Sequence, residues 1–247
     1  MTHSFSEAFR VYPLLGLPVI EEGDDIASLV RSGFSLRDGD VVCIASTIVA
    51  KAEGRLRHLE DYHPGQRARS IASAIGKDPR FVQAVLEESS SVLLERPFLL
   101  VATRFGHVCV NAGIDQSNVG GGRILLLPED PCRSADRIRA GLQRDCAVII
   151  TDTCGRPFRC GVAGVAIGWS GIGAQRDWRG RPDIFGRELE ITREAIVDEI
   201  AGMANLAMGE AGDGIPAVVV RGLEYPRSGG TVFLPEEKDV IRPRLRG

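Results

Sequence analysis

The sequence predicts a globular protein built from both helices and strands, and two observations support this. Short apolar runs at Val41–Ala45 and Cys146–Ile150 have the length and composition of buried strands. Between residues 66 and 91, and again between 192 and 207, apolar side chains recur at helical spacing. At 247 residues the chain is long enough for one large domain or two modest ones, and no repeat or low-complexity linker marks a boundary.

The composition excludes several classes of function. Hydrophobic residues make up 44% of the chain and the formal net charge is -3, without a long basic block, which argues against binding nucleic acid by neutralising phosphates. Residues 1–10 lack the charged head and apolar middle of a secretory signal. No apolar run reaches the roughly 20 residues needed to span a bilayer. We therefore expect a cytoplasmic protein that works neither on nucleic acid nor in a membrane.

Turn residues and caps divide the first half of the chain into elements. The chain is predicted to begin with a strand that enters an irregular loop at 11–20, a helix capped by Asp24 and a strand at 41–45. Two helices separated by Gly76 and Pro79 follow, and then two strands at 97–102 and 108–111 that are joined like a hairpin. Gly120–Gly122 lacks the lysine and serine of a phosphate-binding P-loop, so it is interpreted as a turn before a strand at 124–127.

The second half is predicted in the same way. It begins with a helix that Ser134 caps and that runs to Leu142, followed by a strand at 146–150. A second strand at 161–168 carries glycines between its apolar residues, and we expect it to pack closely against another backbone. A long helix capped by Thr192 then ends at Gly209, and a strand at 216–222 closes the core. The segment 177–187 is too charged for a core. It is either a lid or substrate loop, or a solvated connection.

Polar residues follow several predicted strands directly. Asp152 and Thr153 follow the strand at 146–150, and the carboxyl ends of strands are where ligands gather in sheet proteins. Ser46, Thr47 and Lys51 follow the strand at 41–45 and would suit a phosphate or a purine edge. Solvated turns, with an aspartate acting only as a cap, explain both patterns equally well.

The acidic residues Asp115 and Glu210 also lie where elements end, and with Asp152 and Thr153 they form a set of hard oxygen donors. Such donors select Mg²⁺ or Mn²⁺, ions that most often serve bound phosphates. The six cysteines and four histidines show no zinc spacing, and Cys43, Cys109 and Cys146 sit in apolar runs as core thiols. The residues by themselves therefore predict a phosphate-handling enzyme with one or two divalent ions.

Several strings go further, because together they resemble the coenzyme F420-0:L-glutamate ligase family in its stand-alone form, without the nitroreductase-like extension of some relatives. The match runs in order from about Val11 to Gly222 and leaves 1–9 and 226–247 as poorly matched tails. The strings are Gly16–Ile20, Ser46–Gly54, Phe81–Ser89, Val110–Val119, Thr151–Arg156, Gly186–Leu189 and Met208–Gly214.

The resemblance implies a fold and an activity. The expected fold is an α+β chain with a mixed sheet and two structural subdomains, forming an intertwined homodimer, with residues 1–247 as one ligase unit. The expected reaction is GTP-dependent: phosphoryl transfer to the terminal carboxylate of F420-0 gives an acyl phosphate, which the amine of L-glutamate attacks, and further glutamates are added in some members. A monovalent cation, K⁺, is also implied, with no residue assigned to it.

The resemblance also implies roles for individual residues. Asp115 and Asp152 would hold one divalent ion, Thr153 and Glu210 a second, and Asp115, Asp152 and Lys51 would be catalytic. The residues expected at the GTP site are Leu17, Pro18, Val19, Ile20, Ser46, Thr47, Lys51 and Asn118, together with the loop of Met208, Gly209, Glu210, Ala211, Gly212, Asp213, Gly214 and Ile215.

Arg156, Arg159 and Arg187 are candidates for binding the carboxylates of glutamate or the phosphodiester of F420-0. Two alternatives remain open: the same metal and nucleotide chemistry on a different carboxylate acceptor or a variant of F420-0, and a non-catalytic protein that binds a nucleotide or F420.

Overall fold

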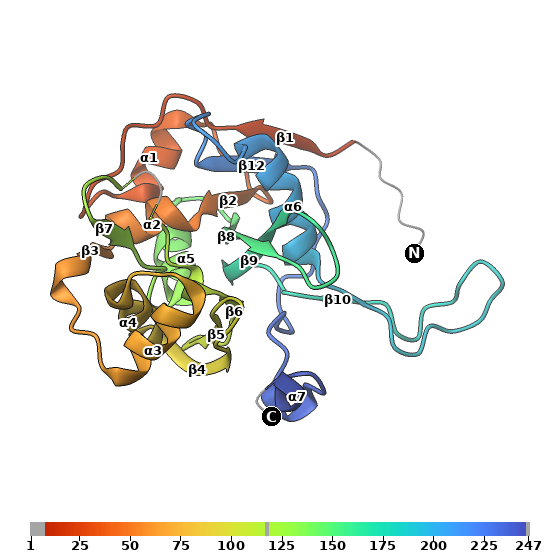
Figure 1. Ribbon diagram of the computed structural model, residues 1–247. Coiled ribbons are helices and arrows are strands. Elements are labelled where there is room, and N and C mark those ends of the chain that lie inside the picture. Colours follow the sequence, from red (N-terminus) through yellow and green to blue (C-terminus); the bar gives the residue numbers. More distant parts are fainter. Residues whose placement is uncertain (1–7, 117–118, 246–247) are drawn as a thin grey trace.

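The computed structural model describes residues 8–116 and 119–245, and within them the chain is organised on a five-stranded mixed sheet (Figure 1). The strand order is β1 (Arg10–Pro13), β12 (Ala217–Arg221), β2 (Val41–Ala45), β8 (Ala147–Gly155) and β9 (Val162–Ser170). Strands β2 and β8 are parallel, and the other neighbours are antiparallel. The expected α+β architecture with a mixed sheet is confirmed.

Helices cover both faces of this sheet, which explains why β2 and the first half of β8 are apolar on both faces. Alternate residues of β2 enter different cores: Val42 and Ile44 pack on one face, Val41 and Cys43 on the other. The first face is covered by α1 (Ile26–Gly33), α2 (Ser46–Ala52) and α5 (Pro131–Gly141), and the second by α6 (Ile196–Met208). The thiols of Cys43, Cys109 and Cys146 are buried, as predicted.

A separate, smaller core lies beneath α3 (Gln66–Ile75) and α4 (Pro79–Glu87). These two helices confirm the periodicity seen in the sequence, and Gly76 separates them in a left-handed conformation with φ 66°. The strands of this part are β4 (Ser89–Leu94), β5 (Leu100–Thr103) and β6 (Val108–Val110), with β3 (Leu56–His58) paired to β7 (Arg123–Leu125). Short 3₁₀ turns occur at η1 (Leu59–Asp61) and η2 (Asn111–Gly113).

The predicted strand at 146–150 is longer than its apolar run, and this corrects the position of Asp152. Strand β8 continues through Thr151–Gly155 because each of these residues pairs with β9 across a hairpin, down to Gly155 opposite Val162. Asp152 is therefore part of the ladder, opposite Val165, and not in a loop after the strand. Backbone pairing with β9 holds it more rigidly than a solvated turn would.

Three predicted helix caps are wrong, by one to four residues. Asp25, not Asp24, caps α1 by accepting the backbone N–H of Ser28 at 3.1 Å. Asp130, not Ser134, caps α5 by accepting the N–H of Arg133 at 3.0 Å. Helix α6 begins after Ala195, whose side chain can accept no such bond, so Thr192 is not its cap. Its end at Gly209 is confirmed.

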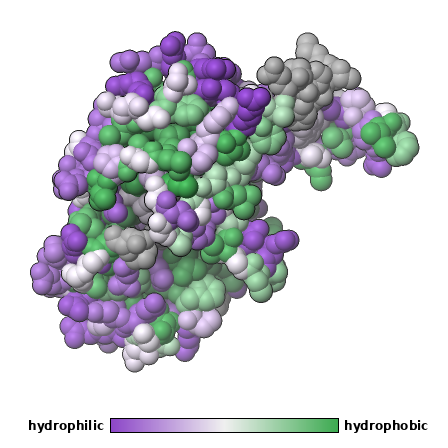
Figure 2. Space-filling model, turned by 90° about the horizontal axis from the view of Figure 1, so that it is seen from above, coloured by the Kyte–Doolittle hydropathy of each residue, from purple (hydrophilic) through white to green (hydrophobic). Residues whose placement is uncertain are grey.

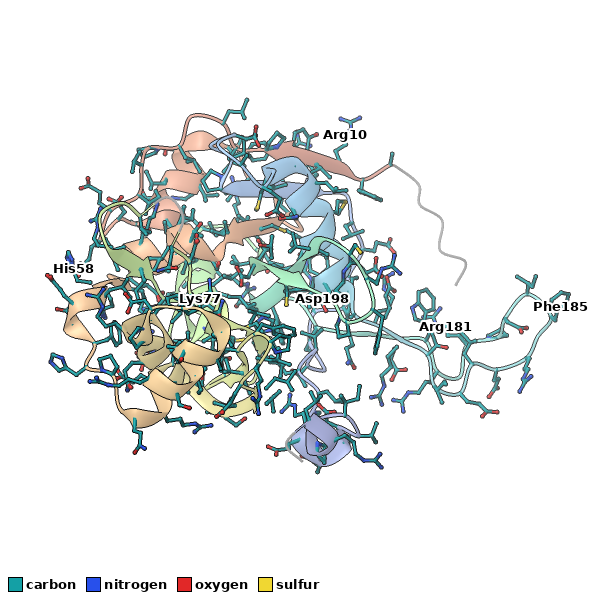
Figure 3. The ribbon with its side chains drawn as sticks, viewed as in Figure 1. Arg10, His58, Lys77, Arg181, Phe185 and Asp198 are labelled. Atoms are coloured by element: carbon teal, nitrogen blue, oxygen red, sulfur yellow. The ribbon has the colours of Figure 1, made fainter. Side chains whose placement is uncertain are left out.

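The charged segment 177–187 belongs to an extended arm that projects from the body of the protein (Figures 1 and 3). Strands β10 (Arg176–Asp177) and β11 (Arg193–Glu194) pair at its base. The arm carries exposed apolar side chains, with Ile184 92%, Phe185 88% and Ile191 86% exposed, and its end is hydrophobic in Figure 2. It is therefore more than a solvated connection, since charged residues alone would serve that purpose.

The C-terminal segment packs back on the body and contains the turn η3 (Glu236–Lys238) and the short helix α7 (Arg242–Leu245). Phe233 lies between Trp169 of β9, at 5.7 Å between ring centroids, and Phe105 of the β5–β6 hairpin, at 6.1 Å. It thereby connects β9 with the β5–β6 hairpin. No helix within residues 8–116 and 119–245 has the length and apolar character needed to cross a membrane.

The predicted close approach of the glycine-rich strand to another backbone is confirmed at Gly168, and it can be tested. A Cβ at this position would lie 2.4 Å from the carbonyl carbon of Pro131 in α5. Gly168→Ala should lower the free energy of unfolding by about 2 kcal/mol, because α5 must move away from the sheet. Urea unfolding measures this, and Gly155→Ala, where a Cβ meets nothing within 4 Å, is the control. Equal stabilities of the two variants would contradict the assignment.

Candidate functional site

The parallel pairing of β2 and β8 brings two of the predicted polar clusters together. Ala45 lies opposite Thr151 in this pair, so the residues that follow both positions meet at one edge of the sheet. Ser46, the first residue of α2, donates a hydrogen bond from its hydroxyl to Oδ1 of Asp152 at 3.1 Å. The two clusters, 106 residues apart in the chain, are therefore one site.

The carboxyl group of Asp152 is in an environment that disfavours its charge. Its pKa is raised to about 6, mainly by burial, and the nearby carboxylates of Asp115 and Glu210 contribute to this rise. Hydrogen bonds from Ser46 and from the backbone N–H of Thr153 oppose this shift only in part. Two of the other predicted metal ligands, Asp115 and Glu210, are thus within electrostatic range of Asp152, and Thr153 is the next residue along β8.

These donors match a hard divalent cation in kind. All are oxygen atoms, and a bound Mg²⁺ or Mn²⁺ would offset the mutual repulsion that raises the pKa of Asp152. Within the described ranges, however, no three His, Cys, Asp or Glu side chains stand close enough together to hold an ion. The carboxylates are therefore gathered at the site without forming a closed cage.

Asp115 reaches the site from the smaller core. Its backbone is fixed by two hydrogen bonds with Leu125 of β7, at 3.0 and 2.8 Å. The preceding strand β6 lies beside β8: the charges of Asp152 and Cys154 add to burial in raising the pKa of Cys109. The site thus depends on how the two cores pack together. Asn118, predicted to bind GTP, lies outside the described residues.

The end of α6 brings the loop of Met208–Ile215 to the same edge. Met208 is buried, and its sulfur lies 3.9 Å from the hydroxyl of Thr151, the residue before Asp152. Gly209 then turns the chain with φ 75°, and a Cβ there would lie 2.2 Å from Oδ2 of Asp213. Glu210 and Asp213 are therefore carried on a tight loop that begins directly beside β8.

The remaining predicted nucleotide-binding residues lie around α2. Thr47 and Lys51 are on this helix, and the loop after Ile20 is tied to its C-terminal end by the hydrogen bond from Gly23 N–H to the carbonyl of Ala52 at 2.9 Å. Ile20 is buried in the core, Leu17 packs against it, and Val19 is 84% exposed. Among the described residues, Lys51 has no carboxylate partner in an ion pair, so its ammonium group is available to a ligand.

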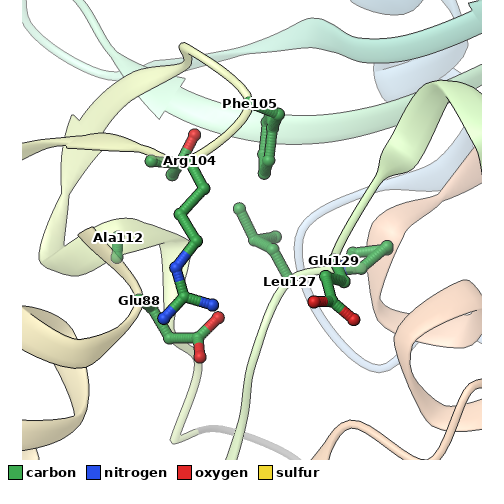
Figure 4. A pocket seen from close by; sticks show the side chains of 8 residues that line it. Glu88, Arg104, Phe105, Ala112, Leu127 and Glu129 are labelled. Atoms are coloured by element: carbon green, nitrogen blue, oxygen red, sulfur yellow. The ribbon is translucent and has the colours of Figure 1, made fainter. Parts of the chain in front are cut away.

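A small cavity elsewhere in the molecule does not belong to this site. It lies between the β5–β6 hairpin and the segment 127–129, with Arg104, Phe105 and Leu127 in its wall (Figure 4). The guanidinium of Arg104 donates to the backbone carbonyl of Glu87. None of the predicted metal or nucleotide residues lines this cavity.

The raised pKa of Asp152 predicts that this side chain costs stability in the metal-free protein. Its folded-state pKa of about 6 lies above the ordinary 3.8, so the cost is fully present above pH 6 and disappears as the pH falls towards 4. Asp152→Asn should therefore stabilise the protein at pH 7.5 by about 1 to 3 kcal/mol, and by much less at pH 4.5. Thermal unfolding in the presence of a chelator measures the difference.

Glu60→Gln is the matched control, since it removes one carboxylate from an exposed turn. The interpretation is wrong if Asp152→Asn destabilises the protein at pH 7.5, or if its effect is the same at both pH values.

Comparison with known proteins shows similarity along nearly the whole chain. Coenzyme F420:L-glutamate ligase of Archaeoglobus fulgidus is 56% identical over 243 residues, which cover 96% of this chain and 98% of the relative. The protein of the same name from Halobacterium salinarum is 53% identical, covering 94% of this chain and 95% of the relative. That of Methanosarcina mazei is 50% identical, covering 96% and 97%.

The family model described as F420-0:Gamma-glutamyl ligase matches residues 15–222. This range includes all of the predicted site residues, from Leu17 to Ile215, and both clusters that meet at the edge of β2 and β8. The chain therefore belongs to the F420-0:gamma-glutamyl ligase family.

Proposed function

We propose that the protein is a ligase that forms an amide bond between L-glutamate and the terminal carboxylate of coenzyme F420-0, using GTP. The observation that carries this proposal is the hydrogen-bonded pair of Ser46 and Asp152, with Asp115 and Glu210 in electrostatic range. The names of relatives at 50–56% identity support glutamate as the group that is added and F420 as its acceptor.

The proposed reaction has two steps. The terminal carboxylate of F420-0 attacks the γ-phosphorus of GTP, which releases GDP and gives an acyl phosphate. The amine of L-glutamate then attacks the acyl carbon, so that the amide bond forms as phosphate leaves and the amine loses a proton. This order explains why a ligase needs a nucleotide: phosphate is a far better leaving group than the oxygen of a free carboxylate.

The residues of this chain would have separate roles in metal binding, orientation and charge stabilisation. Asp115, Asp152, Thr153 and Glu210 would hold Mg²⁺ or Mn²⁺, which supplies positive charge that offsets the charge of the phosphates when bound. Ser46 orients Asp152 by its hydrogen bond. Lys51, which forms no ion pair with a carboxylate in the described part of the chain, would add a point charge near the transferred phosphoryl group.

The nucleotide would lie along α2. In this arrangement Leu17, Pro18 and the exposed Val19 contact the base, Thr47 and Asn118 provide hydrogen-bonding groups, and the loop from Met208 to Ile215 closes over the phosphates. Arg156 and Arg159, on the hairpin between β8 and β9, are exposed close to Asp152 in the chain and suit the carboxylates of glutamate or the phosphodiester of F420-0. A monovalent cation is part of the proposal without an assigned ligand.

An inert binding protein is the weaker candidate. A protein that only bound a nucleotide would gain nothing from a buried carboxylate whose charge is opposed by two others, because this arrangement costs stability. A ligase acting on a different carboxylate acceptor remains the main rival, since the same edge of the sheet would serve both.

We further propose that two chains form a homodimer through the projecting arm. Ile184, Phe185 and Ile191 are almost completely exposed on it, and apolar side chains gathered on an exposed segment mark contact surfaces. The two strands at its base hold the arm away from its own body (Figure 3). A second copy of the chain is the partner that would cover these side chains in every molecule.

The proposed function predicts a specific product. Purified protein incubated with F420-0, L-glutamate, GTP and Mn²⁺ should yield F420-0 that is heavier by one or more glutamyl units, with GDP and phosphate released in equal amounts. Mass spectrometry and phosphate release measure both sides of the reaction. Asp152→Asn should lower the rate by at least about a hundredfold, because it removes charge at the proposed metal site.

Each other result has a clear meaning. Consumption of GTP without change in F420-0 would replace the acceptor and keep the nucleotide chemistry. Turnover of neither compound, with binding of both, would favour the inert binding protein. Full activity of Asp152→Asn would remove Asp152 from the mechanism.

The proposed dimer predicts that apolar side chains of the arm control the oligomeric state. The double variant Phe185→Ser, Ile191→Ser should shift the protein from dimer to monomer in light scattering coupled to gel filtration, because it removes apolar area that the partner would bury. The double variant Glu188→Ser, Glu190→Ser changes exposed polar positions of the same arm and should remain dimeric. A wild-type protein that is monomeric at micromolar concentration would refute the proposal.

A further inference from the structure

Asn205, in the last turn of α6, makes two hydrogen bonds that both bear on Glu210. Its backbone carbonyl accepts the N–H of Gly209, the C-cap residue of the helix, at 3.0 Å. Its side-chain amide donates to Oε1 of Glu210 at 2.8 Å. Asn205 therefore bonds both to the backbone of Gly209, where the loop begins, and to the carboxylate of Glu210, which the loop carries.

The position of Asn205 is itself set by close packing on the sheet. Helix α6 crosses β9 at Gly164, where an added Cβ would lie 2.6 Å from the Cβ of Asn205 and 2.6 Å from the carbonyl oxygen of Ala201. Gly164 is the partner of Thr153 in the β8–β9 ladder. Because Gly164 has no side chain, Asn205 can pack directly against the β8–β9 pair at the position of Thr153.

The chemistry of the amide suits this place. A neutral N–H donor occupies one lone pair of Glu210 and restricts its rotamers, but it does not cancel the negative charge. A lysine or arginine in its place would compete with a cation for the carboxylate. The second oxygen of Glu210 stays free of this bond, and the charge of Glu210 already acts on Asp152.

We infer that Asn205 is a positioning residue, which holds the carboxylate of Glu210 next to Thr153 and Asp152 for the divalent cation. The inference rests on the proposed function, because it takes from it that Glu210 is a metal ligand. It adds a residue that touches neither metal nor nucleotide and acts only through Glu210.

Binding of Mn²⁺ to the substrate-free protein tests this directly. Titration followed by electron paramagnetic resonance should show that Asn205→Ala weakens Mn²⁺ binding by roughly tenfold or more, the size typical for loss of a group that orients a metal ligand. Leu206→Ala is the matched control: Leu206 is the next residue of the same helix, 87% exposed, and its replacement should leave Mn²⁺ binding unchanged.

A double-mutant cycle separates positioning from a general effect on the fold. In a Glu210→Gln background, Asn205→Ala should cause no further loss of Mn²⁺ affinity, because the residue through which it acts has already lost its charge. The melting temperature of the metal-free Asn205→Ala protein should stay close to that of the wild type.

The outcomes distinguish the inference from its premise. If Glu210→Gln weakens Mn²⁺ binding and Asn205→Ala does not, the positioning role is refuted and the proposed metal site stands. If Glu210→Gln has no effect, the role of Glu210 in the proposed function fails first. Additive losses in the cycle would mean that Asn205 acts by another route, which also overturns the inference.

Discussion

The parallel pairing of β2 with β8 is the interaction on which the rest of the site depends. Because the two strands run in the same direction, Ala45, the last residue of β2, lies beside Thr151 of β8, and the next residue after each, Ser46 and Asp152, can hydrogen-bond. The remaining donors come from elsewhere: Asp115 from the smaller core and Glu210 from the loop after α6. The charges of both act on Asp152.

Two carboxylates of this sheet, Asp40 and Asp152, differ in whether a cationic side chain compensates their charge. At the start of β2, Asp40 is 1% exposed and accepts two hydrogen bonds from the guanidinium of Arg221, at 2.7 and 2.6 Å. In the part of β8 that extends beyond β2, Asp152 accepts hydrogen bonds from a serine hydroxyl and a backbone N–H, and in the described residues it forms no ion pair. In the first arrangement a guanidinium compensates the charge of the buried carboxylate, and in the second no cationic side chain does so within the described residues.

Much of the fold and of the site could be predicted from local patterns, and the errors share a cause. Apolar runs located β2 and β12, and periodicity located α3 and α4, because these signals depend on residues close together in the chain. The length of β8 was missed because its polar half pairs with β9 through the backbone, which leaves no apolar signal. Asn205 was missed because an asparagine near a helix end has many ordinary roles, and only its bond to Glu210 distinguishes it.

The sequence by itself determined the candidate donors, since Asp115, Asp152, Thr153 and Glu210 carry hard oxygen atoms whatever their arrangement. It also determined the family, because strings spread from Gly16 to Gly214 carry the resemblance. Only the tertiary structure decided that Ser46 bonds to Asp152, how strongly the environment of Asp152 opposes its charge, that Asn205 bonds to Glu210, and that the arm projects with its apolar side chains exposed. These properties depend on distances and burial between segments far apart in the chain, and such distances exist only once the two cores and α6 have packed together.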